Sequence, residues 1–267
     1  MRADFNTLIW DVQGSVEFDD LLRSFIEGRC DGIYLRVQRG VELDHLDFLT
    51  ELPGLKYVEV NGAVRDDSRA FSLPDVVELV LLTRSRTPVP VTSSDTLESL
   101  GVDDRPGVLD LSGLTRLRAL TLWSFTRPDL RFLSGVPNLE WLKLEGLGSA
   151  VDLRGMESCR SLIEAELLEL QVESLEPLRP LQDLLRLWLI GPRETQISEP
   201  LSLADLSGLS ALRELRIINS GAVQTAEPLL GMPALEDVRL RGTRVLDESL
   251  EALQALSQRA RVVGPDE

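Results

Sequence analysis

Apolar positions recur in a fixed phrase along this chain: apolar residues at a spacing of three, followed by apolar-any-apolar. The segments "LSGLTRLRALTL", "LSGVPNLEWLKL" and "LSGLSALRELRI" show it most clearly. The first residue of each closing apolar pair marks one repeat. The markers are Leu35, Val58, Leu79, Leu100, Leu120, Leu142, Ala165, Leu187, Leu215 and Val238. Successive markers lie 20 to 23 residues apart, except that Leu187 and Leu215 are 28 apart. Such a period predicts stacked structural repeats.

The pattern inside each repeat predicts its elements. The triplet Leu142-Lys143-Leu144 alternates apolar and polar residues, which is typical of a short strand with one buried face. The earlier residues at spacing three suit a turn of 3₁₀ or α-helix with one apolar edge. A single repeat cannot bury that edge alone, so stacked repeats share one core and their strands become parallel neighbours.

On these segments the chain resembles the leucine-rich-repeat proteins, of the short bacterial type with about 22 residues per repeat. The resemblance covers residues 30–245. It implies an α/β leucine-rich-repeat solenoid with a single curved parallel β-sheet on the concave side. Short helices, 3₁₀ turns and loops are then expected on the convex side.

The sequence departs from the family pattern in three places. The usual Asn after the strand is mostly replaced, for example by Phe125, Leu170 and Thr243, so the turns must be satisfied differently. The repeat around 97–102 is weak, and another repeat carries Cys159 and Ala165 in core positions. None of these departures breaks the period.

We expect one domain over residues 1–267, with an N-terminal cap at 1–29, about ten repeats over 30–245 and a C-terminal helical cap at 246–267. A solenoid must cover its end faces. At the start, "TLIWDV" is predicted as a strand and "EFDDLLRSFIEG" as an amphipathic helix. At the end, "LDESLEALQALSQRA" is predicted as a helix and "RVV" as a closing strand.

Loops are expected at 83–96 and 191–202, because both stretches combine Pro with polar residues. The second loop accounts for the spacing of 28 residues between Leu187 and Leu215. Cys30 and Cys159 lie far apart in a fold whose contacts join neighbouring repeats, so both are predicted to be buried thiols.

Composition bounds the location and the partners. The sequence has no run of about 18 apolar residues that would predict a membrane span, and the first residues lack a signal-peptide pattern, so we expect a cytoplasmic protein. Lys and Arg number 28 against 44 Asp and Glu, a formal charge of −16. This charge disfavours nucleic acid as a partner and favours a basic protein. Alternatively, the acidity only keeps a leucine-rich surface soluble.

The sequence offers little material for catalysis. His45 is the single histidine, and we expect it to be an exposed residue of a convex helical turn. No cysteine pair has metal-ligand spacing, and no glycine-rich phosphate loop or dinucleotide motif occurs. We therefore predict no enzyme activity, no cofactor and no metal.

Strand geometry predicts a binding surface. If Leu142 and Leu144 point into the core, Trp141 and Lys143 point outward. The same rule in every repeat gives the candidate partner-binding residues of the concave face: Tyr34, Tyr57, Trp123, Trp141, Lys143, Glu166, Arg186, Trp188, Arg216 and Arg239. Trp and Tyr at exposed positions are typical of binding hot spots. Alternatively, these rings stabilise the strands by cross-strand pairing, and Trp123 stacks on Trp141.

Three functional interpretations remain open. The first is a monomeric, non-enzymatic module that recognises a protein or peptide on the concave face, the general role that the resemblance implies. A more specific form is an immunity or antitoxin-type protein that neutralises a basic toxin. The other alternative is a structural protein that self-assembles through an end cap or a sheet edge.

Overall fold

A computed structural model describes residues 4–12, 18–89, 95–105, 110–193, 199–247 and 250–265. The chain divides into two compact units, Met1–Leu120 and Thr121–Glu267, which we call unit 1 and unit 2. Strand β8 (Ala119–Phe125) begins in unit 1 and ends in unit 2. The expectation of a single domain stays a prediction.

Unit 1 is built on a parallel sheet in the order β1-β2-β4-β6-β7. Its strands are β1 (Thr7–Val12), β2 (Gly32–Val37), β4 (Tyr57–Asn61), β6 (Glu78–Leu82) and β7 (Ser99–Asp103). A separate short pair joins β3 (Glu42–His45) to β5 (Ala63–Asp66). The helices are α1 (Phe18–Ile26) and the 3₁₀ turns η1 (Asp47–Glu51) and η2 (Ser68–Ser72).

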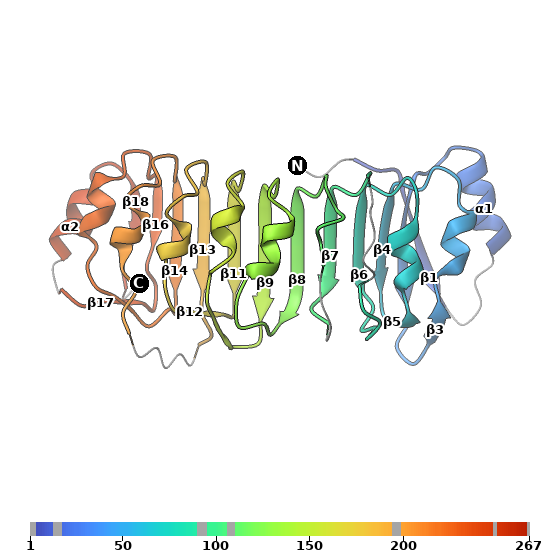
Figure 1. Ribbon diagram of the computed structural model, residues 1–267, viewed down its shortest axis with the longest axis horizontal. Coiled ribbons are helices and arrows are strands. Elements are labelled where there is room, and N and C mark those ends of the chain that lie inside the picture. The colour runs from blue at the N-terminus through green and yellow to red at the C-terminus, as the bar shows by residue number, and fades with distance from the viewer. Residues whose placement is uncertain are drawn as a thin grey trace. The chain divides into compact units, whose positions relative to one another are not determined.

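Unit 2 repeats this plan with a parallel order β9-β11-β13-β14-β16-β18 (Figure 1). Its sheet strands are β9 (Trp141–Gly146), β11 (Glu164–Leu168), β13 (Arg186–Ile190), β14 (Glu214–Ile218), β16 (Asp237–Arg239) and β18 (Arg261–Val263). Two short pairs join β10 (Ala150–Val151) to β12 (Gln171–Val172) and β15 (Ala222–Val223) to β17 (Arg244–Val245). The helices are η3 (Arg131–Gly135), η4 (Met156–Ser158), η5 (Glu176–Leu178), η6 (Leu203–Leu206), η7 (Glu227–Gly231) and α2 (Leu250–Leu256).

The leucine spacing of three is the hydrogen-bond spacing of the turns that precede the strands. The N–H of Leu133 donates to the carbonyl of Leu130 at 2.9 Å, and the N–H of Val136 donates to Leu133 at 3.0 Å. The same bonds join Leu178 to Leu175 and Leu181 to Leu178, each at 3.0 Å. We call such a series of backbone hydrogen bonds between leucines three residues apart a 3₁₀ relay. Because bonds from residue i to i+3 eclipse those side chains, every third residue lies on one edge, and these residues are buried in the core.

The turn after each strand uses backbone conformation and hydroxyl groups where the family's Asn is missing. Four residues past the marker, the left-handed region is occupied by Ser124, Glu169 and Asn219, with φ of 54°, 53° and 53°. One residue further, Ser220 donates its N–H to Oγ1 of Thr243 at 3.1 Å, and Thr243 donates this hydroxyl to the carbonyl of Ile217 at 2.9 Å. Phe125 and Leu170 fill the same position as buried apolar side chains.

The expected end elements are present in each unit. Strand β1 pairs with β2 and turns Leu8, Trp10 and Val12 to the more buried side, as predicted. Helix α1 follows it, with Leu21 and Phe25 buried. At the other end of the chain, α2 and β18 form where the sequence predicts a helix and a closing strand, and β18 pairs with β16.

Two local expectations need comment. His45 is exposed, as expected. The prediction of a helical turn at this position is wrong, because His45 is the last residue of strand β3 and η1 begins only at Asp47. The weak repeat at 97–102 still forms a strand, β7, which pairs with β6. Residues 83–89 and 191–193 have no regular structure, as expected for loops, whereas 90–94 and 194–198 lie outside the described residues.

Candidate functional site

The outward side of the unit 2 sheet, which we call the open face, carries side chains in rows across neighbouring strands. The first row consists of Trp141, Glu164, Arg186, Glu214 and Asp237. The second row consists of Lys143, Glu166, Trp188, Arg216 and Arg239. The residues between them, such as Leu142 and Leu187, are fully buried. The strand register thus brings all the predicted binding residues of unit 2 except Trp123 into two adjacent rows.

Ion pairs order the charges of these rows. Arg186 pairs with Glu164 on the neighbouring strand, and Arg216 pairs with Glu214 on its own strand. Arg239 contacts Asp237 at 2.8 Å. The hydrogen bond from Arg239 lowers the pKa of the Asp237 carboxyl and raises the pKa of the Arg239 guanidinium. Both groups are therefore charged at neutral pH, and ion pairs hold acidic and basic side chains together on the open face.

The centre of the second row is a cation–π pair. The guanidinium carbon of Arg216 lies 3.8 Å from the centroid of the Trp188 ring. Trp188 Nε1 and Arg216 Nε are both buried there without a hydrogen-bond acceptor among the described residues. The stack fixes the two side chains and leaves two donors unsatisfied, an arrangement that costs folding free energy.

A third row on the open face is aliphatic, and the sequence reasoning missed it. Leu168, Ile190 and Ile218 lie in register across β11, β13 and β14, and all three are half-buried. Each follows directly after a buried strand residue, as Ile190 follows Leu189. The alternation rule that placed Trp188 outward would have found this row, had it been applied to aliphatic as well as aromatic residues.

Trp123 stands apart from these contacts. It is half-buried at the end of β8, three residues past its marker, whereas Trp141 directly precedes its own marker. Within the described part of the chain, the ring contacts include none between Trp123 and Trp141. The alternative that these two rings stack on each other is therefore not supported, because they occupy different positions along their strands.

The face of the unit 1 sheet differs from the prediction at one residue. Tyr57 is only 9% exposed, because the Phe5 ring stacks on it with centroids 5.4 Å apart. Its hydroxyl donates to the Glu59 carboxylate. The expectation that Tyr57 is open to water is wrong, because a segment before β1 covers it. Tyr34 is half-buried and lies in register with Glu59 on the next strand.

These side chains border a pocket of about 310 Å³ on unit 1. The pocket is lined by Asp4, Phe5, Thr7, Ile9, Tyr34, Tyr57, Glu59 and Glu78. Both tyrosines predicted from the sequence therefore belong to one concave feature, together with three carboxylates.

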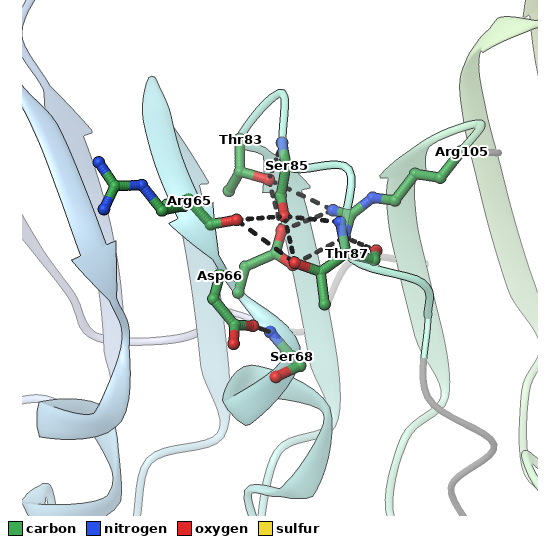
Figure 2. Close-up of polar contacts among 8 residues, drawn as sticks. Arg65, Asp66, Ser68, Thr83, Ser85, Thr87 and Arg105 are labelled. Carbon is green, nitrogen blue, oxygen red and sulfur yellow. Dashed lines mark hydrogen bonds and ion pairs between the residues drawn. The ribbon is translucent and has the colours of Figure 1, made fainter. Parts of the chain in front are cut away.

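A second polar cluster of unit 1, unforeseen in the sequence, joins Thr83, Ser85, Thr87 and Arg105 to Asp67 (Figure 2). Arg105 donates Nη1 and Nη2 to the two carboxylate oxygens of Asp67 at 2.7 and 2.5 Å. Thr83 donates its hydroxyl to Asp67, and Arg105 Nη1 also donates to the carbonyl of Thr87 at 3.0 Å. Ser85 donates to the carbonyl of Arg65 at 3.0 Å.

The Asp67–Arg105 cluster is structural. The two charged side chains are 0% and 3% exposed, so they offer no surface to a ligand. They tie the start of η2 to the loop after β6 and to the segment after β7. No sequence pattern predicts the pair, because its members lie 38 residues apart without a motif.

The chain's other candidates for catalysis are two thiols and one imidazole. Cys30 and Cys159 are buried free thiols, and burial raises the pKa of Cys159 to about 11. His45 lies 3.4 Å from Asp47 on the exposed surface. In the described ranges, no three His, Cys, Asp or Glu residues are close enough to hold a metal ion. None of the helices in those ranges has the length and apolar composition that crossing a bilayer requires.

Comparison with known proteins bears on the fold. No protein-family profile and no curated protein matches the sequence. Among solved structures, an internalin (inlF) from Listeria monocytogenes matches with a TM-score of 0.60 and 15% identity, over 94% of this chain and 84% of that one. The LRR ectodomain of the membrane receptor kinase GASSHO1/SCHENGEN3 from Arabidopsis thaliana, in complex with CASPARIAN STRIP INTEGRITY FACTOR 2, matches with a TM-score of 0.57 and 13% identity. That match covers 87% of this chain and 29% of the other. With its series of spaced leucines and its parallel strands, the chain has the leucine-rich-repeat fold, an α/β solenoid.

Proposed function

We propose that this protein is a recognition module that binds a protein partner on the open face of unit 2. The observation that carries the proposal is the aliphatic row Leu168, Ile190 and Ile218, which runs in register beside Trp188. Half-exposed aliphatic side chains next to an indole and framed by charges match the apolar centre and polar rim of protein interfaces.

The rigidity of this face supports the proposal. Each row residue stands on a strand that is hydrogen-bonded on both sides, and the ion pairs hold the long side chains of Arg186 and Arg239 in place. Binding to an ordered surface loses less side-chain entropy than binding to mobile side chains.

The comparisons support recognition in a general way. The Arabidopsis ectodomain is described in complex with another factor, and leucine-rich repeats present long ordered surfaces of the same kind. The formal charge of −16 favours a basic partner, because opposite net charges accelerate encounter. A basic toxin domain is one such partner, which keeps the immunity or antitoxin interpretation within this proposal.

The experiment is affinity capture by the full-length chain from its native host, followed by calorimetry with the purified partner. We expect the double variant Trp141→Ala with Trp188→Ala to weaken binding by about 2 kcal/mol or more, as hot-spot truncations do. Leu230→Ala is the matched control, because Leu230 is exposed on η7 and not on a sheet strand.

Two outcomes of this experiment would contradict the proposal. Unchanged affinity in the tryptophan double variant would refute binding through the open face. Self-association of the chain in sedimentation at micromolar concentration, without a captured partner, would favour the structural interpretation instead.

A further inference from the structure

We propose that the pocket of unit 1 is a binding site for an arginine side chain. The site is separate from the residues that carry the proposed function, but it rests on that function, because a protein or peptide partner supplies the arginine. The pocket combines aromatic rings with carboxylates, and these are the two groups that guanidinium ions bind best.

The shape of the pocket follows from the strand register. Thr7, Gly32, Tyr57 and Glu78 lie in one row across β1, β2, β4 and β6. Gly32 has no side chain to separate its neighbours, so Phe5, just before β1, reaches Tyr57 on β4 and stacks on its ring. The adjacent row contributes Ile9, Tyr34 and Glu59. The pocket is therefore lined by two adjacent rows, and each row contributes an aromatic ring and a carboxylate.

The charge of the lining has one sign. Asp4, Glu59 and Glu78 are carboxylates, and no basic residue appears among the described lining residues. The guanidinium of Arg36 lies 5.6 Å from the Tyr34 centroid, outside the lining, and pairs with Asp11 at 2.9 Å. An anionic ligand is disfavoured in such a pocket, whereas a cation is attracted by the negative charge of the lining.

The chemistry favours an organic cation over a metal ion. No three acidic side chains in the described ranges come close enough to coordinate a metal, and the aromatic rings between them supply faces and not ligand atoms. A volume of about 310 Å³ lies at the small end of ligand pockets, which span about 300–1,000 Å³. It suits one side chain better than a cofactor.

Guanidinium fits better than ammonium for a geometric reason. It is planar, so it can stack on a ring while its edge donates two parallel hydrogen bonds to a carboxylate. This protein uses both contacts elsewhere, in the stack of Arg216 on Trp188 and in the two-pronged pairing of Arg105 with Asp67. In the pocket, Tyr34 offers a half-buried ring, and Glu59 is held in place by the Tyr57 hydroxyl.

The test is an NMR titration of the isotope-labelled full-length chain with the probe peptide acetyl-Gly-Arg-Gly-amide. The matched peptide carries citrulline, which has nearly the shape of arginine without its charge. We expect saturable shifts at Gly32, Tyr34 and Tyr57 with the arginine peptide only. Substituting Glu59→Gln should weaken its binding about fivefold, because one charge-assisted hydrogen bond becomes neutral.

The control variant is Glu51→Gln, since Glu51 is an exposed carboxylate of η1 in the same unit and does not line the pocket. It should bind the probe as the unmodified chain does. The side-chain carbonyl that Glu59→Gln introduces can still accept the hydrogen bond from the Tyr57 hydroxyl. If the spectrum of Glu59→Gln without peptide differs from that of the unmodified chain only close to residue 59, the fold of this variant is intact.

Three results would overturn the inference: no saturation at millimolar peptide, equal binding of the citrulline peptide, or equal binding of a lysine peptide. None of these depends on the natural partner. A failed titration therefore leaves the open-face proposal intact, and a failed capture experiment leaves the pocket proposal intact.

Discussion

At the scale of single residues, the most consequential contact of this protein is the buried pair Asp67–Arg105. Neither charge reaches water, so the partners that replace water include the opposite charge, the hydroxyl of Thr83 and, for Arg105, the carbonyl of Thr87. Breaking a buried ion pair from one side leaves an uncompensated charge, whereas replacing both members by apolar residues is often neutral.

We expect Asp67→Asn to lower the free energy of unfolding by about 3–5 kcal/mol, because it removes the buried charge that both Nη atoms of Arg105 contact. Denaturant unfolding followed by circular dichroism measures the change. The control is Asp66→Asn at the next position, whose exposed side chain accepts the N–H of Ser68 at 3.0 Å. This control should cost less than about 0.5 kcal/mol. Equal losses at 66 and 67 would show that the buried pair has no special role.

At the scale of elements, most repeats place a 3₁₀ turn before a parallel strand, and three of them have a left-handed residue four positions past the marker, at Ser124, Glu169 and Asn219. The relay at η7 is followed by helix α2 in place of another relay. Arg259, just after α2, caps η7 by donating to the carbonyls of Met232 at 2.9 Å and Leu229 at 3.1 Å. One side chain thus joins the closing helix to the final relay.

Substituting Arg259→Met should therefore destabilise the end of unit 2 by about 1–2 kcal/mol, since it removes charge-assisted bonds to partly buried carbonyls. Hydrogen exchange should quicken first in η7 and α2, because end elements open locally. Arg244→Met serves as the control, since the exposed Arg244 side chain makes no hydrogen bond or ion pair within the described residues. Unaltered exchange in η7 would contradict the role of Arg259.

At the scale of the whole molecule, the dominant property is the charge of −16. Many individual carboxylates are paired, such as Glu164 and Asp237, but the excess of 44 acidic over 28 basic residues remains. Self-repulsion of a net charge opposes the compact state, and salt screens it.

We therefore expect Tm to rise as salt increases from about 0.01 M to about 1 M, over which the Debye length falls from about 30 Å to about 3 Å. Scanning calorimetry at neutral pH measures it. The same series at an acidic pH where the net charge is near zero is the control, and it should show a smaller rise. A fall of Tm with salt at neutral pH would mean that attractive ion pairs outweigh the repulsion.

Most of the fold can be predicted from the spacing of apolar residues. The relay from Leu130 to Leu139 and the strand at Leu142–Leu144 are both local patterns, since each depends on residues three or two positions apart. The end elements β1, α1, α2 and β18 were also predicted from local patterns of apolar residues. The helical turn expected at His45 failed for the converse reason, because β3 forms only by pairing with β5, a strand contributed by the next repeat.

The candidate site could be predicted from the sequence only in part. The alternation of β13 places Trp188 outward, and the register of β9, β11, β13, β14 and β16 then gathers the predicted residues into rows. Neither the cover of Phe5 over Tyr57, nor the stack of Arg216 on Trp188, nor the burial of Asp67 with Arg105 follows from any spacing. Local periodicity decides which way a side chain points, because backbone geometry alternates regardless of context. What covers, pairs or encloses that side chain depends on segments 22 to 52 residues away, and only the packed tertiary structure brings them together.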